Sequence, residues 1–151
     1  MNRKLVSLAA AAALSLVAAL PAQASSREEA QALLKAALAE VKAKGMEGAA
    51  HEFNAGGSWY KGTLYVFVAD LKANIVAHSA NAKIVGKNLW EVKDATGKFF
   101  VQDQVKLVQT AGSGQVQMRW MNPSTKQIDD GEAVLAKVPG QDAYIGAVWF
   151  K

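Results

Sequence analysis

Apolar residues recur at two different spacings along the chain, and each spacing predicts a different kind of element. From residue 27 into the fifties they recur every three to four positions, which indicates a long helix with one buried stripe. Ser25 or Ser26 is expected to cap its start, Gly45 and Gly48 to weaken or kink its middle, and Asn54, Gly56 and Gly57 to end it. The stripe consists of Ala30, Leu33, Leu34, Ala37, Leu38 and Val41.

Residues 63–70, TLYVFVAD, have the composition of a strand that is apolar on both faces. A strand covered on both sides belongs in the middle of a sheet, with a helix on one face and a core or ligand cavity on the other. Residues 71–74 are predicted to turn, and residues 75–80 to return as the second strand of a hairpin, with His78 near its end. One face of the first strand would carry Leu64, Val66 and Val68, and the other Tyr65, Phe67 and Ala69.

The remaining chain predicts a long irregular crossover at residues 80–97, a second helix and three further strands. Thr96 is expected to cap this helix and Gly112 to end it, and strands should follow at 115–121, 132–138 and 143–150. One side of the helix would carry Phe100, Val101, Gln104, Val105 and Val108. This order predicts an α+β domain with a central antiparallel five-stranded sheet, a long N-terminal helix and a second helix after strand 2. The helices are expected to be concentrated on one side of the sheet.

The first residues have the pattern of a signal peptide. Arg3 and Lys4 precede an apolar run at residues 5–20, Pro21 breaks it, and the small residues Ala22 and Ala24 flank a cleavage site before Ser25. A retained membrane anchor is the competing interpretation, but 16 apolar residues are short for a span that needs about 20. We therefore predict a signal peptide at 1–24, cut after Ala24, and one periplasmic or secreted domain at 25–151.

The charge and the cysteine content of the chain argue against several classes of function. Without Arg3 and Lys4, the 17 basic residues fall to 15 against 13 acidic ones, so the mature chain carries too little charge to indicate nucleic-acid binding. The absence of cysteine excludes disulfides, thiolate catalysis and thiolate metal sites. Stability must therefore come from packing.

Nothing in the sequence favours a metal, a cofactor or catalysis. His51 lies 27 positions before His78 on a different expected element, with only Glu52 beside it, so a metal site is not expected. Gly112-Ser113-Gly114 lacks the spacing of a hydrolase nucleophile and follows a helix instead of a strand. The sequence predicts a protein that is not an enzyme and needs no cofactor.

Five motifs occur in an order and spacing that resemble a known family. They are FNAGGSW at 53–59, LYVFVADL at 64–71, AHSANAKIVGKNL at 77–89, KDATGKFF at 93–100 and NPSTK at 122–126. Over residues 27–151 the chain resembles the single Cache domains, which are PAS-like extracellular sensor modules of bacteria. The resemblance implies a ligand-binding domain of the kind found in chemoreceptors and histidine kinases, which recognise small molecules and often short carboxylates. A free-standing exported member would bind a solute and either present it to a membrane receptor or histidine kinase or work as a simple binding protein.

His78 matches the histidine of the family's AHP motif, with Ser79 in place of the proline. Its imidazole would donate a hydrogen bond to a ligand carboxylate, or alternatively hold the following loop in place. Tyr65, Phe67, Trp90 and Trp120 would form the aromatic wall of a pocket on the sheet face away from the long helix, or plain core. Lys87 would supply positive charge beside the same loop, or be a solvated lysine.

One departure from the family weakens the expectation of a carboxylate. The resemblance leads us to expect a lysine and, three residues later, a tyrosine ahead of VPG, where this chain has Gly131 and Val134. A less charged ligand, or no ligand at all, therefore becomes more plausible. The alternative function is a structural or interaction protein with a filled core that docks on a membrane kinase or redox complex, and a homodimer through the first helix also stays open.

Overall fold

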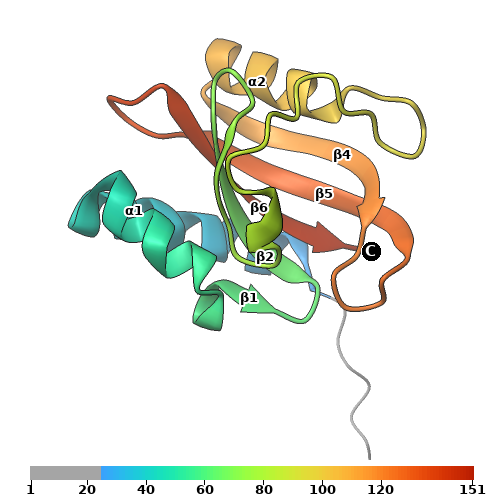
Figure 1. The fold of residues 1–151 in the computed structure, drawn as a ribbon, viewed down its shortest axis with the longest axis horizontal. Helices are drawn as coiled ribbons and strands as arrows, with labels where there is room; N and C mark the ends of the chain where they lie inside the picture. Colours follow the sequence, from blue (N-terminus) through green and yellow to red (C-terminus); the bar gives the residue numbers. More distant parts are fainter. Residues whose placement is uncertain (1–24) are drawn as a thin grey trace, which may run out of the picture.

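The computed structural model describes residues 25–151, so the predicted signal peptide at 1–24 lies outside the described residues. Two helices, two short 3-10 turns and six strands follow one another over this range (Figure 1). Their bounds are α1 Arg27–Asn54, η1 Gly57–Trp59, β1 Tyr60–Lys61, β2 Leu64–Asp70, β3 Ile75–His78, η2 Ala82–Ile84, α2 Phe100–Thr110, β4 Ser113–Met121, β5 Ile128–Lys137 and β6 Ala143–Phe150.

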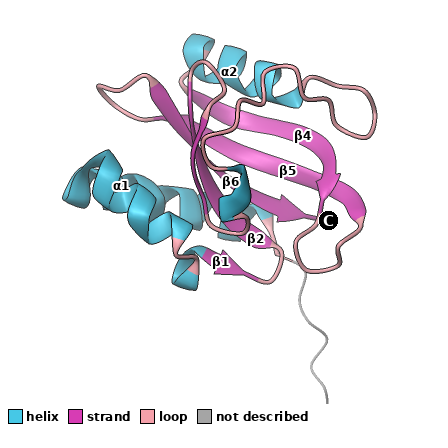
Figure 2. Ribbon diagram, viewed as in Figure 1, coloured by secondary structure: helices cyan, strands magenta, loops and turns pink. Residues whose placement is uncertain are grey.

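The strands form one antiparallel sheet in the order β1-β2-β6-β5-β4, and β3 pairs with β2 (Figure 2). The predicted hairpin of β2 and β3 is confirmed, and the expected five strands gain a sixth, the two-residue β1. β2 lies between other strands and is buried at five of its seven positions, as its apolar sequence predicted. Phe67 in β2 is the register partner of both His78 in β3 and Gly146 in β6. This pairing positions the end of the hairpin beside the centre of the sheet.

The two faces of the sheet carry separate cores, and each core is covered by a different helix (Figure 2). α1 packs on the face that carries Val66 and Val68, whereas α2 packs on the face that carries Tyr65 and Phe67. The predicted faces of β2 are confirmed. The prediction that both helices lie on one side is wrong, because the apolar stripe of an amphipathic helix does not specify which of two apolar sheet faces it will cover.

α1 begins with a capping box in which the Ser26 hydroxyl accepts the Glu29 N–H and the Glu29 carboxylate accepts the Ser26 N–H. Gly45 has φ 74° and ψ 172°, which breaks the helical geometry in its middle. The cap, the kink at Gly45 and the end at Asn54 agree with the sequence, whereas Gly48 stays helical. Neither α1 nor any other helix within residues 25–151 is long and apolar enough to cross a membrane.

The start of α1 is tied to the sheet by one ion pair. Arg27 Nε and Nη2 donate to the two carboxylate oxygens of Glu132 in β5 at 2.6 and 2.7 Å, and the Trp149 indole donates to Glu132 at 3.1 Å. The Glu132 side chain is 0 % exposed. Hydrogen bonding from Arg27 therefore lowers the pKa of the Glu132 carboxyl, although burial opposes it.

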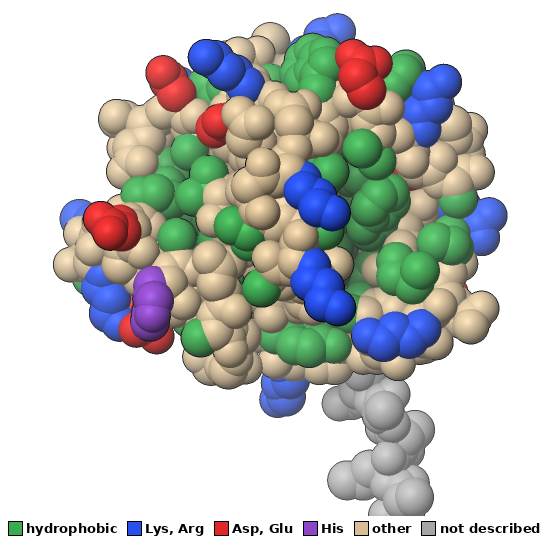
Figure 3. All heavy atoms as spheres, viewed as in Figure 1, with side chains coloured by type: hydrophobic (Ala, Val, Ile, Leu, Met, Phe, Trp, Pro, Cys, Tyr) green, Lys and Arg blue, Asp and Glu red, His purple; other side chains and the backbone are tan. Residues whose placement is uncertain are grey.

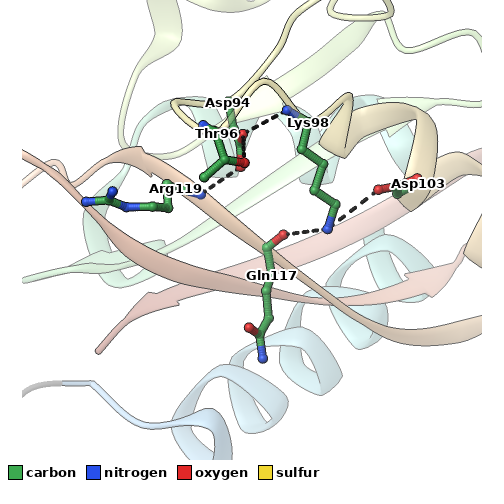
Figure 4. Close-up of polar contacts among 6 residues, drawn as sticks. All are labelled: Asp94, Thr96, Lys98, Asp103, Gln117 and Arg119. Atoms are coloured by element: carbon green, nitrogen blue, oxygen red, sulfur yellow. Dashed lines mark hydrogen bonds and ion pairs between the residues drawn. The ribbon is translucent and has the colours of Figure 1, made fainter.

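Asp94 organises the crossover into α2 (Figure 4), and the prediction that Thr96 caps this helix is wrong. Asp94 accepts the Thr96 hydroxyl at 2.6 Å and the backbone N–H groups of Thr96, Lys98 and Arg119 at 2.8, 3.1 and 3.0 Å. α2 then begins at Phe100 with Phe99 in the N-cap position and no side-chain cap, so Thr96 lies three residues before that position and its hydroxyl donates to Asp94 instead. Burial alone would raise the pKa of Asp94, but these hydrogen bonds outweigh it and lower the pKa to about 2.

Candidate functional site: an inner cavity and an outer groove

A small cavity lies on the sheet face away from α1, where the sequence predicted a pocket. Its volume is about 30 Å³, which is room for about two water molecules. Pockets that enclose a drug-sized ligand measure about 300–1,000 Å³, so this face of the sheet is largely filled by the chain's own side chains. The lining residues are Tyr65, Phe67, Ile75, His78, Ile84, Leu89, Phe100, Val101, Gln104, Met118, Trp120, Tyr144 and Val148.

An open groove of about 500 Å³ lies outside the cavity. Cavity and groove share four lining residues, namely Tyr65, His78, Ile84 and Trp120, and we call these four the throat. Figure 3 views this side of the molecule and shows apolar side chains gathered beside basic ones. The groove is also lined by Ala80, Asn81, Lys83, Met121, Pro123 and Lys126.

His78 is fixed at the throat by hydrogen bonds at both ends of the residue. Its backbone N–H donates to Asn54 Oδ1 at 2.9 Å, and its Nδ1 accepts the Asn81 N–H at 2.9 Å. Burial lowers the pKa of His78 to about 4, so the imidazole is neutral near pH 7 and carries its proton on Nε2. Within residues 25–151, Nε2 has no hydrogen-bond partner, yet no buried side-chain nitrogen or oxygen is left unpaired. Nε2 is therefore open to the cavity or the groove.

Tyr65 presents a second free donor at the throat. The residue is 3 % exposed, and its ring lies against the imidazole of His78 with ring centroids 4.7 Å apart. Burial raises the pKa of the Tyr65 hydroxyl, which therefore stays protonated at any physiological pH. No hydrogen bond within residues 25–151 uses this hydroxyl. Because no fully buried side-chain oxygen in this range lacks a hydrogen-bond partner, the hydroxyl is open to the cavity or the groove.

Gln104 supplies the one amide in the inner cavity. It projects from α2, its Oε1 accepts the Tyr144 hydroxyl at 3.0 Å, and its side chain is almost fully buried. The sequence placed Gln104 in the apolar stripe of the second helix without a role. The signal in the sequence was one polar residue in an otherwise apolar stripe, because a buried amide needs a hydrogen-bond partner.

Ser79 replaces the family's proline and makes bonds that a proline could not make. Its N–H donates to the Val66 carbonyl at 2.9 Å, and its hydroxyl accepts the Val66 N–H at 2.9 Å. The same hydroxyl donates to the Trp59 carbonyl at 2.7 Å. Ser79 therefore extends the β2–β3 pairing beyond His78 and holds the imidazole against the sheet.

The structure brings four of the six predicted ligand-binding residues together and separates two. His78, Tyr65, Phe67 and Trp120 all line the cavity, and whether they bind a ligand stays a prediction. Trp90 is 38 % exposed and lines neither the cavity nor the groove. Lys87 is exposed and also lies outside both linings, because its place in the crossover is set by backbone bonds to Ile75 and Ile84.

Gly131 and Val134 have different consequences for the site. Val134 belongs to the core under α1, so a tyrosine at this position would not reach the cavity. Gly131 lies on the other face, where a Cβ atom would come within 2.9 Å of the Phe150 ring. The ring of Phe150 therefore takes the space into which a lysine at residue 131 would extend.

The described residues offer no metal centre. No group of three or more His, Asp or Glu side chains within residues 25–151 is close enough to hold an ion. His51 lies exposed on α1, on the opposite side of the sheet from His78. The groups at the throat are hydrogen-bond donors, a chemistry that suits recognition of an acceptor.

Comparisons with known proteins agree with this geometry. The sequence matches the model of the family "Single Cache domain 2" over residues 2–150. A search of curated proteins found no significant relative.

The fold is similar to solved structures of chemotaxis and Cache chemosensory proteins. One is a periplasmic sensor domain of a chemotaxis protein, 22 % identical, with a TM-score of 0.65 over 82 % of this chain and 88 % of that chain. Another is a methyl-accepting chemotaxis protein from Vibrio parahaemolyticus RIMD 2210633, 17 % identical, with a TM-score of 0.69 over 82 % and 86 %. A third, 21 % identical with a TM-score of 0.65 over 82 % and 86 %, comes from a study of carboxylic acid recognition by a Cache chemosensory domain. With its match to the family model from residue 2 to residue 150, the chain belongs to the Single Cache domain 2 family.

Proposed function

We propose that this protein is an exported sensor or solute-binding module that recognises a small organic molecule at the throat between the cavity and the groove. Recognition occurs without turnover. The ligand's polar group lies at the throat, and an apolar part reaches into the inner cavity.

One observation carries the proposal: His78 Nε2–H and the Tyr65 hydroxyl both lie at the throat and have no partner within residues 25–151. Two neutral donors side by side suit a ligand oxygen that accepts hydrogen bonds. Such bonds are stronger at a site that is mostly shielded from water. A carboxylate fits this description, and one of the similar structures comes from a study of carboxylic acid recognition.

The proposed partner is a membrane receptor or a histidine kinase. Two of the similar structures are a periplasmic sensor domain of a chemotaxis protein and a methyl-accepting chemotaxis protein. By analogy, the liganded domain presents its surface to a membrane protein that transmits the signal. Export through the predicted signal peptide, with cleavage after Ala24, would bring the domain to that partner.

A thermal-shift screen of the purified mature domain tests ligand binding. The panel contains short carboxylates, amino acids, amines and the uncharged amides of the same acids. A ligand that binds the folded state only, present at about 100 times its dissociation constant, adds about 2.7 kcal/mol to the stability. His78→Ala should abolish that shift in a protein whose circular dichroism is unchanged.

His51→Ala is the matched control, because His51 is exposed on the opposite side of the sheet. It should leave the ligand-induced shift intact. A shift that survives in His78→Ala but disappears in His51→Ala would place the site elsewhere. A panel that gives no shift at any concentration would count against ligand binding.

The volume of the inner cavity favours a second candidate function. At about 30 Å³ the cavity is nearly filled by the chain's own side chains and leaves little room for a ligand. This is expected for a domain that serves only to dock on a membrane kinase or redox complex. This candidate predicts an inert screen together with a stable complex in a pull-down from solubilised membranes. Substitutions at the throat would leave that complex unchanged.

A further inference from the structure

A second groove lies on the sheet face that α1 covers, opposite to the cavity and the throat. It runs between α1 and the turn that joins β5 to β6, and we call it the helix groove. Its volume is about 510 Å³, which falls in the range of sites that bind small organic molecules. Its apolar lining consists of Leu38, Ala39, Val41, Val138 and Pro139.

The floor of the helix groove belongs to the packed core. Val41 in α1 and Val138, directly after β5, are both buried among the side chains under α1. Leu38 is half-buried, and Ala39 and Pro139 are exposed along the two sides. The groove therefore presents apolar surface to water on both walls as well as on part of its floor.

Backbone hydrogen bonds hold the wall opposite α1 in place. The Val138 N–H donates to the Ala143 carbonyl at 2.9 Å, and the Gln141 N–H donates to the Val138 carbonyl at 3.2 Å. The Leu71 N–H donates to the Asp142 carbonyl at 3.0 Å, which ties this turn to the one between β2 and β3. The helix groove is thus formed without a ligand, so binding there requires little ordering of the chain.

Cations line the helix groove, and none of its lining residues is acidic. Lys42 in α1 and Lys137 at the end of β5 are exposed, and neither takes part in an ion pair within residues 25–151. Lys44, in the same turn of α1, is different because its ammonium pairs with Glu40 and Glu52 at 2.7 and 3.4 Å. An anion in the helix groove would therefore lie near two lysines that no described carboxylate neutralises.

The combination of apolar walls and unpaired lysines defines the chemistry of the occupant. A small polar anion would leave the apolar walls in contact with water, and an uncharged hydrocarbon would gain nothing from the lysines. A molecule with one hydrocarbon chain and a negatively charged headgroup uses both features of the lining.

We propose that the helix groove is a second binding site, which takes up a single-chain anionic amphiphile from solution. Its hydrocarbon chain lies against Leu38, Val41 and Val138, and its headgroup lies within reach of Lys42 and Lys137. The sheet separates this site from the throat, so binding in the helix groove does not require His78. This site goes beyond the proposed function, which concerns the other face of the sheet.

Isothermal titration calorimetry of the purified mature domain tests the ligand class. The probes are octyl sulfate, decyl sulfate, decyl maltoside and decyltrimethylammonium, each below its critical micelle concentration. Decyl sulfate should bind about fivefold more tightly than octyl sulfate, because two more CH₂ groups are partly removed from water. Decyl maltoside should bind about tenfold more weakly than decyl sulfate, and the cationic probe more weakly still. Equal binding of the anionic, neutral and cationic decyl probes would overturn the inference.

The two lysines should contribute modestly, because both are exposed. Lys42→Gln and Lys137→Gln should each weaken decyl sulfate binding about threefold, and the double variant about tenfold. Raising the salt concentration should weaken binding to the unmodified domain and have little effect on the double variant. Unchanged binding in the double variant would show that the lysines do not recognise the headgroup.

A matched pair of alanine positions on α1 tests the place of binding. Ala39 and Ala36 are both exposed, but only Ala39 lines the helix groove. Glutamate is a good helix former, so both Ala39→Glu and Ala36→Glu should keep the circular dichroism of the unmodified domain. Ala39→Glu puts a carboxylate into the groove and should weaken decyl sulfate binding about tenfold or more. Ala36→Glu has the same net charge and should bind as the unmodified domain does. Equal effects of the two substitutions would mean that the amphiphile lies elsewhere.

NMR spectroscopy separates this inference from the proposed function. Decyl sulfate should shift the backbone amide resonances of Lys42 and Val138 but not that of His78, and His78→Ala should bind it as tightly as the unmodified domain. Shifts centred on His78 would place the amphiphile at the throat, which would overturn the inference and leave the proposed function standing. Uptake of several molecules per domain, unchanged in Ala39→Glu, would show non-specific detergent binding and also overturn it.

Two further measurements identify other occupants of the helix groove. Light scattering that shows a dimer in the unmodified domain and in Ala36→Glu, but a monomer in Ala39→Glu, would place a second copy of the chain there. Sedimentation of the domain with phosphatidylglycerol vesicles, lost in Ala39→Glu alone, would make the groove a membrane contact. Either result would overturn the proposal of a single amphiphile, whereas a monomer that ignores vesicles and binds decyl sulfate would support it.

Discussion

The ring of Tyr65 lies against the imidazole of His78, with ring centroids 4.7 Å apart and planes inclined by 30°. The two residues come from paired strands, since His78 in β3 is the register partner of Phe67 in β2. Each residue shields the other from water, yet each keeps one donor open at the throat. The geometry of the hairpin therefore affects both the pKa of His78 and the two donors that we propose bind the ligand.

The first prediction concerns the stability of the domain in mild acid. Burial lowers the pKa of His78 to about 4, whereas an unfolded chain has a histidine pKa of about 6.5. Between these values the unfolded chain binds a proton that the folded domain does not. The free energy of unfolding should therefore decrease as the pH falls from about 6.5 to 4, by about 3 kcal/mol in total.

Urea unfolding of the unmodified domain and of His78→Gln at several pH values checks this. The variant should lose most of the pH dependence in that window, and His51→Gln, at an exposed position, should not. An NMR titration that gives His78 a pKa near 6.5 would contradict the prediction.

The second prediction concerns Gly146, which lies directly under the ring of Phe67. A Cβ atom at residue 146 would overlap this ring and approach Leu135 Cδ2 to 2.9 Å. Gly146→Ala should therefore destabilise the domain by about 1–3 kcal/mol in chemical denaturation, because the packed wall of the cavity cannot yield without strain.

Phe67→Leu provides the control for this substitution. The smaller side chain costs stability by itself, but it should reduce the additional cost of Gly146→Ala in the double variant. Additive effects of the two substitutions would mean that the ring contact is not the cause.

The third prediction concerns the Asp94 turn shown in Figure 4. Its carboxylate accepts four hydrogen bonds, and an asparagine amide would place N–H groups opposite some of those donors. Asp94→Asn should cost about 2–3 kcal/mol in urea unfolding. Because the pKa of Asp94 is lowered to about 2, the stability that its carboxylate contributes is present above about pH 4 and is lost as the pH falls towards 2.

Asp103→Asn is the matched control for Asp94→Asn. Asp103 is exposed and makes one ion pair, to Lys98 at 3.5 Å, so its substitution should change the stability by less than about 0.5 kcal/mol. Equal effects of the two substitutions would show that the hydrogen bonds of Asp94 do not hold the turn.

The fourth prediction concerns the pair of Arg27 and Glu132. Arg27→Gln leaves the carboxylate of Glu132 buried with the Trp149 indole as its remaining described partner, and it should destabilise the domain in urea unfolding. The Arg27 side chain is 42 % exposed, which places the cost below that of a fully buried pair. The loss should shrink at acidic pH, where the Glu132 of the variant takes up a proton.

Two other variants serve as comparisons for Arg27→Gln in the same urea unfolding experiment. Lys44→Gln removes exposed ion pairs to Glu40 and Glu52 and should leave the stability almost unchanged. The double variant Arg27→Met with Glu132→Leu should recover most of the stability lost in Arg27→Gln. If Arg27→Gln is as mild as Lys44→Gln, the pair does not anchor the start of α1.

The sequence predicted the elements well because the physical signals are local. The double-sided apolar pattern of β2, the cap at Ser26 and the break at Gly45 each depend on neighbouring residues only. The family motifs then placed His78 near a pocket on the correct sheet face.

The parts that could not be predicted depend on contacts between distant segments. The face that α2 covers, the donors around Asp94 and the space that Phe150 takes from residue 131 are all set by tertiary packing. Lys83 and Lys126 are 43 positions apart in the sequence and line the same groove only because η2 and the β4–β5 turn border it. Trp90 and Lys87 were expected near the pocket because they lie in the crossover that follows His78. In the folded domain, neither side chain lines the cavity or the groove.

The last prediction concerns Ser79, where the family motif has a proline. Ser79→Ala would leave the fully buried Val66 N–H without its acceptor, and it should cost about 1–3 kcal/mol. Ser79→Pro also removes the N–H that donates to the Val66 carbonyl, so it should cost more than Ser79→Ala although it restores the family's motif. Ser58→Ala, at an exposed serine in η1, serves as the control and should be neutral in the same urea unfolding experiment. A proline variant as stable as the unmodified domain would mean that β2 and β3 can re-pair without Ser79, and His78 would then be held at the throat by Asn54 and Asn81 alone.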